Sequence, residues 1–176
     1  MLHKQTLVIL VGVIALGGCG RGNVEQANAN TTCTATLTGS QTATLDCAAW
    51  VLRLAEGNTY TIGLASEKGL AIALVLPNEG ELSPGAYSIS HANIWGGASY
   101  NPGGSLSTLW GTTKSAPGES VKREPLGTVT YTLTSVTATP DGESPVGKMF
   151  TIHGTLDATL PALPPTTGAV NVHAVF

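Results

Sequence analysis

The chain has 176 residues, of which 42% are hydrophobic and only 11% are charged, and its formal net charge at pH 7 is −3. Lysine and arginine are few and do not cluster, which argues against a nucleic-acid-binding surface and against a polybasic contact with anionic lipid. The length fits one domain, and the apolar fraction is large enough to fill its core.

The first eighteen residues have the layout of an export signal. A positive residue near the start precedes an apolar run at residues 6–16, which is short for a membrane-spanning helix. The tetrapeptide Leu16-Gly17-Gly18-Cys19 resembles the lipobox of bacterial lipoproteins. The resemblance implies transfer of a diacylglyceryl group to the Cys19 thiol, cleavage after Gly18 and acylation of the new amino group. A plain secretory signal with an incidental cysteine, or an uncleaved N-terminal anchor, is the alternative.

Cys19 is therefore the predicted lipidation site, and its acyl chains, palmitate among them, would anchor the protein to a membrane of a bacterial cell envelope. The next residue is Gly20 rather than the aspartate of inner-membrane retention signals, which favours the outer membrane. Residues 19–31 are small and polar and predict a flexible, lipidated tether. Residues 1–18 are then a signal peptide, and residues 32–176 form a single β-domain.

The two remaining cysteines, Cys33 and Cys47, predict a disulfide, because an even pair in an exported chain is typical of an oxidising compartment. A hairpin turning at residues 39–41 would place apolar side chains on one face and threonines on the other. The register that does so sets Leu37 beside Ala43 and the two cysteines opposite each other. Free thiols and a metal pair are alternatives, but two ligands without a nearby histidine make a poor zinc site.

A second hairpin is predicted next, with its turn at residues 56–58. Aligning the large side chains of its two arms sets Trp50 opposite Leu64, and a short helix over residues 47–56 is the alternative. The run at residues 70–76 is apolar on both faces, which predicts a central strand that is covered on both sides.

Segments of mixed polarity follow. Residues 86–90 and 106–111 predict short strands. Residues 93–105 are rich in glycine and asparagine, and residues 114–125 contain two prolines, so both predict loops.

Alternation of apolar and polar residues is clearest in the C-terminal third. It predicts a meander of strands at residues 129–136, 150–160 and 170–176, with a turn at residues 140–142. In total, about nine or ten strands without a long helix predict an all-β fold. An antiparallel β-sandwich fits this pattern best, and a small β-barrel is the alternative.

Three polar residues form one candidate site. In the expected register of the last hairpin, His173 meets Asp157 on the outer face, and His153 lies on the same face of the preceding strand. Such a cluster could bind a metal or orient a base, whereas the pair alone is an ordinary cross-strand contact.

Three aromatic residues form the other candidate site. Trp95, Tyr100 and Trp110 lie in or near the glycine-rich segment and could form a platform for a sugar ring or a partner. The alternative is that they fold back into the core, which is where aromatic side chains are more often found.

The sequence contains no motif for nucleophilic catalysis or nucleotide binding. The favoured hypothesis is a lipid-anchored envelope protein whose non-catalytic β-domain binds or scaffolds an envelope protein or glycan, without metal or cofactor. The alternative is an envelope hydrolase or metal-dependent enzyme that uses His153, Asp157 and His173. A flat, exposed strand face would favour binding, and a cleft with further polar groups would favour the enzyme.

Overall fold

The computed structural model describes residues 31–54, 58–77, 80–105, 108–116, 127–144 and 147–176. Within these residues every regular element is a β-strand, and every strand pairing is antiparallel. The strands are β1 (Thr31–Gly39), β2 (Ala43–Leu54), β3 (Tyr60–Ala65), β4 (Leu70–Leu76), β5 (Gly85–Ser88), β6 (Trp95–Tyr100), β7 (Trp110–Lys114), β8 (Thr128–Ser144), β9 (Gly147–Pro161) and β10 (Ala169–Val175).

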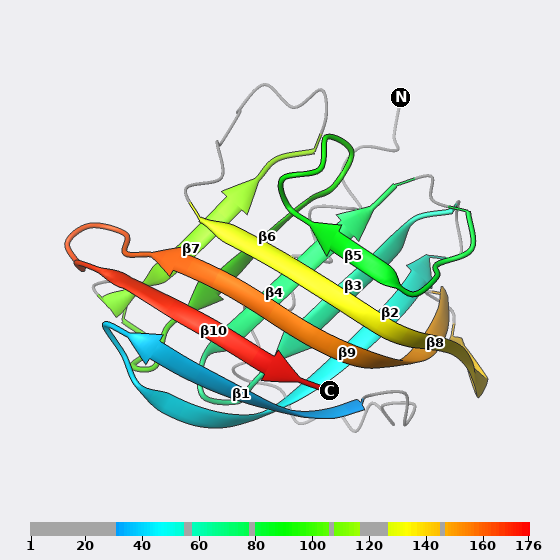
Figure 1. The fold of residues 1–176 in the computed structure, drawn as a ribbon, viewed down its shortest axis with the longest axis horizontal. Coiled ribbons are helices and arrows are strands. Elements are labelled where there is room, and N and C mark those ends of the chain that lie inside the picture. Colours follow the sequence, from blue (N-terminus) through cyan, green and yellow to red (C-terminus); the bar gives the residue numbers. More distant parts are fainter. Residues whose placement is uncertain (1–30, 55–57, 78–79, 106–107, 117–126, 145–146) are drawn as a thin grey trace.

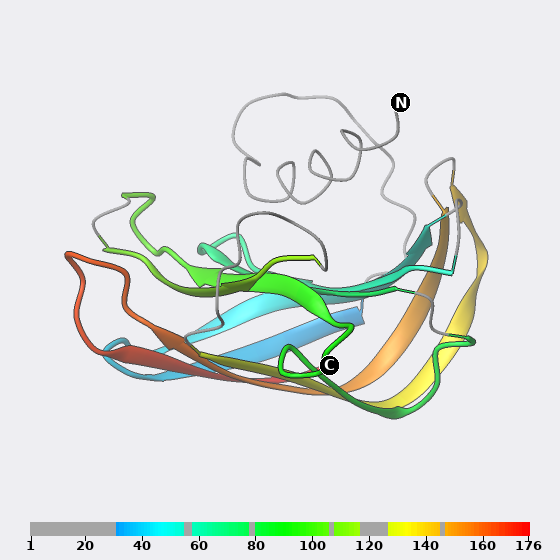
Figure 2. The ribbon, with the colours of Figure 1, turned by 90° about the horizontal axis from the view of Figure 1, so that it is seen from above.

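The strands form two layers that face each other (Figure 1 and Figure 2). One layer has the order β5-β8-β9-β10-β1 and the other β2-β3-β4-β6-β7, and the chain passes between them through the β1–β2 hairpin. A second pairing of β9 with β2 closes a small barrel of β9, β10, β1 and β2. The all-β prediction is confirmed, and the architecture combines the sandwich with the barrel that was its alternative.

The first hairpin has the predicted register. Leu37 pairs with Ala43, and Cys33 pairs with Cys47. The two cysteines are disulfide-bonded, with their Cα atoms 4.9 Å apart. The apolar residues of β1 are buried and its threonines at even positions are exposed, because only one face of this strand meets the core.

The second hairpin differs from its prediction by one residue. Val51 pairs with Ile62, and Trp50 pairs with Gly63 rather than with Leu64. The reason is that β2 runs without interruption from the first hairpin, so its odd positions keep pointing inward as far as Ala49 and Val51. Trp50 therefore faces outward, and the helix alternative for this segment is wrong.

The middle of the chain contains one strand that the sequence did not predict. β6 lies within the expected glycine-rich loop and pairs with both β4 and β7. Only glycine fits at position 96, because a Cβ there would lie 2.1 Å from the Ala73 carbonyl oxygen. The strand expected at residues 106–111 lies slightly later, as β7, whereas β4 is a central strand as predicted.

The C-terminal meander of β8, β9 and β10 is confirmed, but one turn was misplaced. The backbone of β8 continues through residues 140–142, where the sequence predicted a reversal, and Ser144 still pairs with Gly147. The pairing is irregular between Ala138 and Glu143 instead. Pro140 has no N–H to donate to the neighbouring strand. It therefore interrupts the regular pairing of β8 with β9, but it does not end the strand.

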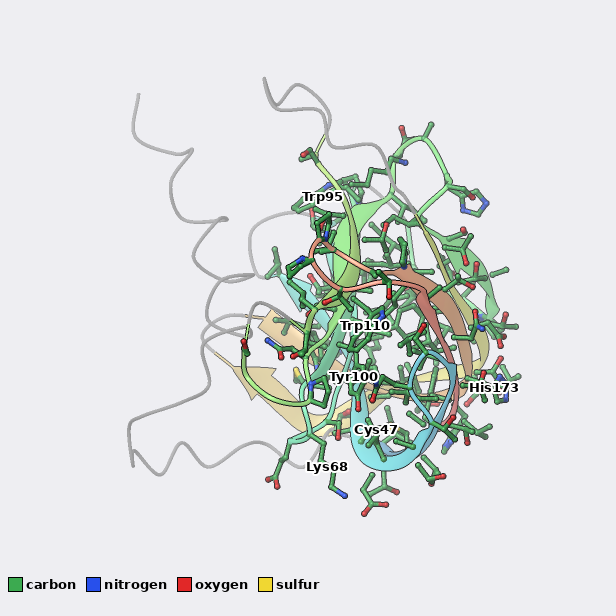
Figure 3. The ribbon with its side chains drawn as sticks, turned by 90° about the vertical axis from the view of Figure 1, so that its left-hand side faces the viewer. Cys47, Lys68, Trp95, Tyr100, Trp110 and His173 are labelled. Atoms are coloured by element: carbon green, nitrogen blue, oxygen red, sulfur yellow. A yellow bond between two sulfur atoms is a disulfide. The ribbon has the colours of Figure 1, made fainter. Side chains whose placement is uncertain are left out.

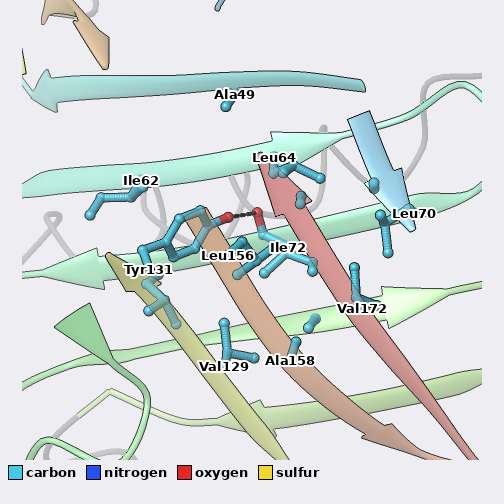
Figure 4. Close-up of a cluster of buried hydrophobic side chains, with 14 of the residues drawn as sticks. Ala49, Ile62, Leu64, Leu70, Ile72, Val129, Tyr131, Leu156, Ala158 and Val172 are labelled. Carbon is cyan, nitrogen blue, oxygen red and sulfur yellow. Dashed lines mark hydrogen bonds between the residues drawn. The ribbon is translucent and has the colours of Figure 1, made fainter. Parts of the chain in front are cut away.

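The core lies between the two layers. Leu156 of β9 and Val172 of β10 belong to one layer and Ile62 of β3 to the other, and all three side chains are buried in the core (Figure 4). Tyr131 of β8 is also fully buried, and its hydroxyl donates a hydrogen bond of 3.1 Å to the backbone oxygen of Ile72 in β4. Tyr131 thus joins the layers by a polar contact within an apolar core.

Candidate functional site

The His173–Asp157 pair forms where the register predicted it. The two residues are cross-strand partners in β10 and β9, and His173 Nδ1 lies 2.7 Å from Asp157 Oδ1. Both side chains are well exposed, at 55% for His173 and 66% for Asp157. Solvent screens such a pair, so its contribution to stability is about 0–1 kcal/mol. The pair is therefore a feature of the surface rather than of a closed active site.

A shallow polar groove surrounds this pair. Its volume is about 240 Å³, and threonine, asparagine, aspartate and histidine side chains from β1, β8, β9 and β10 line most of it. Thr159 donates a hydrogen bond of 3.0 Å to Asn171 Oδ1 within it. We call this surface the polar groove; it is lined by Thr36, Thr38, Thr128, Asp157, Ala158, Thr159, Asn171, Val172 and His173. The outward positions of four adjacent strands supply its polar groups, because the inward positions fill the core.

His153 does not complete a cluster with the pair. It is exposed and pairs with Ser135 across the strands, and it lies four positions before Asp157 in β9, about 13 Å away along an extended strand. Among the residues that the structure describes, no three histidine, cysteine, aspartate or glutamate side chains converge as metal ligands. The His173–Asp157 pair instead lies in the shallow polar groove, with both side chains exposed.

The three aromatic residues do not form a common platform. Tyr100 and Trp110 are cross-strand partners that point into the core, with their rings stacked at a centroid distance of 6.0 Å. Burial raises the pKa of the Tyr100 phenol. Trp95 is half-buried and lies five positions before Tyr100, so its side chain is on the opposite face of β6 (Figure 3). The platform hypothesis is therefore wrong for Tyr100 and Trp110.

Two features of the structure had no signal in the sequence. A second shallow hollow of about 310 Å³ lies beside the disulfide and is lined by Thr32, Thr34, Asp46 and Val175 in addition to the two cysteines. Near the stacked rings, Trp110 Nε1 and Asn101 Oδ1 are buried without a hydrogen-bond partner among the described atoms. Both features are formed by residues that come together only through the pairing of strands, so the sequence alone does not indicate them.

The predicted lipobox with Cys19, and all of the tether except Thr31, lie outside the described residues. Across the described ranges, no helix is long and apolar enough to cross a membrane. Comparison with known proteins found no matching family model, no matching curated protein and no matching solved structure.

Proposed function

We propose that this chain is a lipid-anchored protein of a bacterial cell envelope whose β-domain binds a partner without catalysing a reaction. The observation that carries the binding role is the shallow, exposed polar groove around His173 and Asp157. The lipobox-like residues that end at Cys19 support the anchor and the location. Gly20 favours the outer membrane.

The anchor depends on one sulfur atom. Two or more acyl chains bind a bilayer stably, whereas one chain binds only marginally. Replacing Cys19 by alanine removes the only atom that the modification can use. We expect the Cys19→Ala protein to lose its partitioning into the detergent phase and its normal processing. Ser40, an exposed residue of the described β-domain, provides the control: Ser40→Ala should partition like the unaltered protein. A Cys19→Ala protein that is processed and membrane-bound as before would contradict the anchor.

The polar groove suits a partner rich in hydrogen-bonding groups. Its threonine hydroxyls and the Asn171 amide both donate and accept hydrogen bonds, and the exposed Asp157 carboxylate accepts them. An envelope glycan or a polar protein surface has this chemistry. An enzyme would need a third group aligned with the His–Asp pair, and His153 is not placed to supply it.

Photo-crosslinking in intact envelopes tests the groove as the binding surface. A photoreactive residue at Thr38, inside the groove, should give discrete adducts, whereas the same residue at Thr113, exposed on the other layer, should give few. Adding Asp157→Ala and Asn171→Ala to the Thr38 probe should remove the adducts. Equal labelling from the two probe positions, or adducts that persist in the double variant, would contradict this role for the groove.

A further inference from the structure

The second hollow, which lies beside the disulfide, adjoins the polar groove. On β1, Thr34 lines the second hollow and Thr36 lines the polar groove. On β10, Val175 lines the second hollow and His173 lines the polar groove. Residues two positions apart on a strand lie on the same face of the sheet. The two hollows therefore form one elongated surface along β1 and β10, which lie side by side (Figure 1).

The length of this elongated surface fits a short extended segment of another chain. The surface follows β1 from Thr32 in the second hollow to Thr38 in the polar groove. These residues are six positions apart, which is about 20 Å along a strand. An extended polypeptide of about seven residues has the same length, because its rise per residue is that of β1 itself.

Carboxylates supply the formal charge of this surface. Asp46 lines the second hollow and Asp157 lines the polar groove, and no described lysine or arginine lines either of them. Asp157 is paired with His173, whereas the exposed Asp46 carboxylate has no hydrogen-bond or ion-pair partner among the described residues. The second hollow therefore presents an unpaired negative charge to a cationic group.

Val175 gives the second hollow an apolar contact beside this charge. Its side chain is 54% exposed, and no other large hydrophobic residue is exposed in the part of the chain that the structure describes. Thr34 is the cross-strand partner of both Val175 and Asp46, so the three side chains form one row across β10, β1 and β2. Lysine and arginine side chains have an apolar stem and a charged end. Such a side chain can pack its stem on Val175 and direct its charge to Asp46.

We propose that the two hollows together bind one extended polypeptide segment of the partner, with a lysine or arginine side chain in the second hollow. This inference rests on the proposed binding role of the polar groove and names the class of partner. The threonine hydroxyls and the Asn171 amide of the groove can satisfy the N–H and C=O groups of an extended backbone. The described residues that line the two hollows include no tryptophan, tyrosine or phenylalanine on which a sugar ring could stack, so a glycan fits this surface less well.

Photo-crosslinking from both ends of the surface in intact envelopes tests this proposal. A photoreactive residue is placed at Thr32, in the second hollow, or at Thr38, in the polar groove, and the attachment sites are sequenced by mass spectrometry. Both probes should attach to the same polypeptide, at sites about six residues apart, because an extended segment and β1 have the same rise per residue. A lysine or arginine should lie next to the site at which the Thr32 probe attaches.

Reversing one charge provides the matched comparison. Asp46→Lys should lower the yield of Thr32 adducts by at least about tenfold, because it brings two cations together. Asp46→Asn, which removes the charge without adding one, should lower the yield less. Glu81→Lys makes the same change of charge at an exposed position that lines neither hollow, and it should leave the yield unchanged.

The outcomes separate this inference from the proposed function. Thr38 adducts without Thr32 adducts on the same polypeptide would overturn this inference and leave the polar groove as a binding surface. Thr32 adducts on a glycan, or adducts that neither Asp46 variant reduces, would do the same. The absence of Thr38 adducts would refute the groove as the binding surface, and this inference with it.

Discussion

Truncating Tyr131 to alanine is expected to lower the free energy of unfolding by about 3–5 kcal/mol, the range for deleting a buried aromatic side chain. The ring is fully buried between the layers, where it also packs at a centroid distance of 6.2 Å from Phe176. Tyr131→Phe keeps the ring and removes only the hydrogen bond to Ile72. Its expected cost is about 1–2 kcal/mol, because the buried carbonyl oxygen loses that donor. Chemical denaturation of both variants measures the difference.

Tyr87 provides the control for the hydroxyl. Its O–H donates a hydrogen bond of 2.6 Å to the Ser83 backbone oxygen, but in an exposed setting. Tyr87→Phe should therefore change the free energy of unfolding by less than about 0.5 kcal/mol, as is usual at the surface. Equal costs for the two phenylalanine variants would contradict the role of Tyr131 as a polar link between the layers.

Alkaline pH provides a second readout for the same residue. Burial raises the pKa of Tyr131 well above its ordinary value of 10.0. Above pH 10 the unfolded chain loses this proton while the folded chain keeps it, so the associated stability is complete below pH 10 and declines as pH rises. The Tyr131→Phe variant lacks this phenol, so its free energy of unfolding should fall less steeply with pH. The difference between the two slopes should be up to about 1.4 kcal/mol per pH unit. Parallel pH profiles would contradict the burial of this group.

Replacing Cys33 and Cys47 together by alanine is expected to lower the free energy of unfolding by about 3 kcal/mol. The disulfide links residues that are 14 apart in the sequence, and in the chain-entropy model it stabilises the fold by restricting the unfolded chain. Denaturation should give the same midpoint for the variant with and without reductant. The unaltered protein should shift toward the variant when reduced, and a midpoint that does not move would contradict a stabilising bridge.

The sequence predicted the fold best where one face of a strand is buried and the other is not. In β1 apolar and polar residues alternate strictly, and in β10 they alternate from Val170 to Ala174, so only one register buries the apolar set. The same alternation predicted the contact between His173 and Asp157. Part of the candidate site was therefore readable from the sequence, because it follows directly from register.

Prediction failed where both faces of a strand carry apolar residues. Ala49, Trp50, Val51 and Leu52 are all apolar, so the sequence offered no alternation and the larger side chains were assigned to the core. Trp50 faces outward because β2 is one unbroken strand that takes part in both hairpins, so its odd positions face inward throughout. The polar groove depends on the registers among four strands, which are properties of the tertiary structure.

The most direct test of the account is the mass of the N-terminal peptide of the protein isolated from its native membrane. We predict a chain that begins at Cys19 and carries a diacylglyceryl group on the sulfur, with a further acyl chain on the amino group. A peptide in which residue 19 carries no lipid would contradict both the proposed anchor and the envelope location.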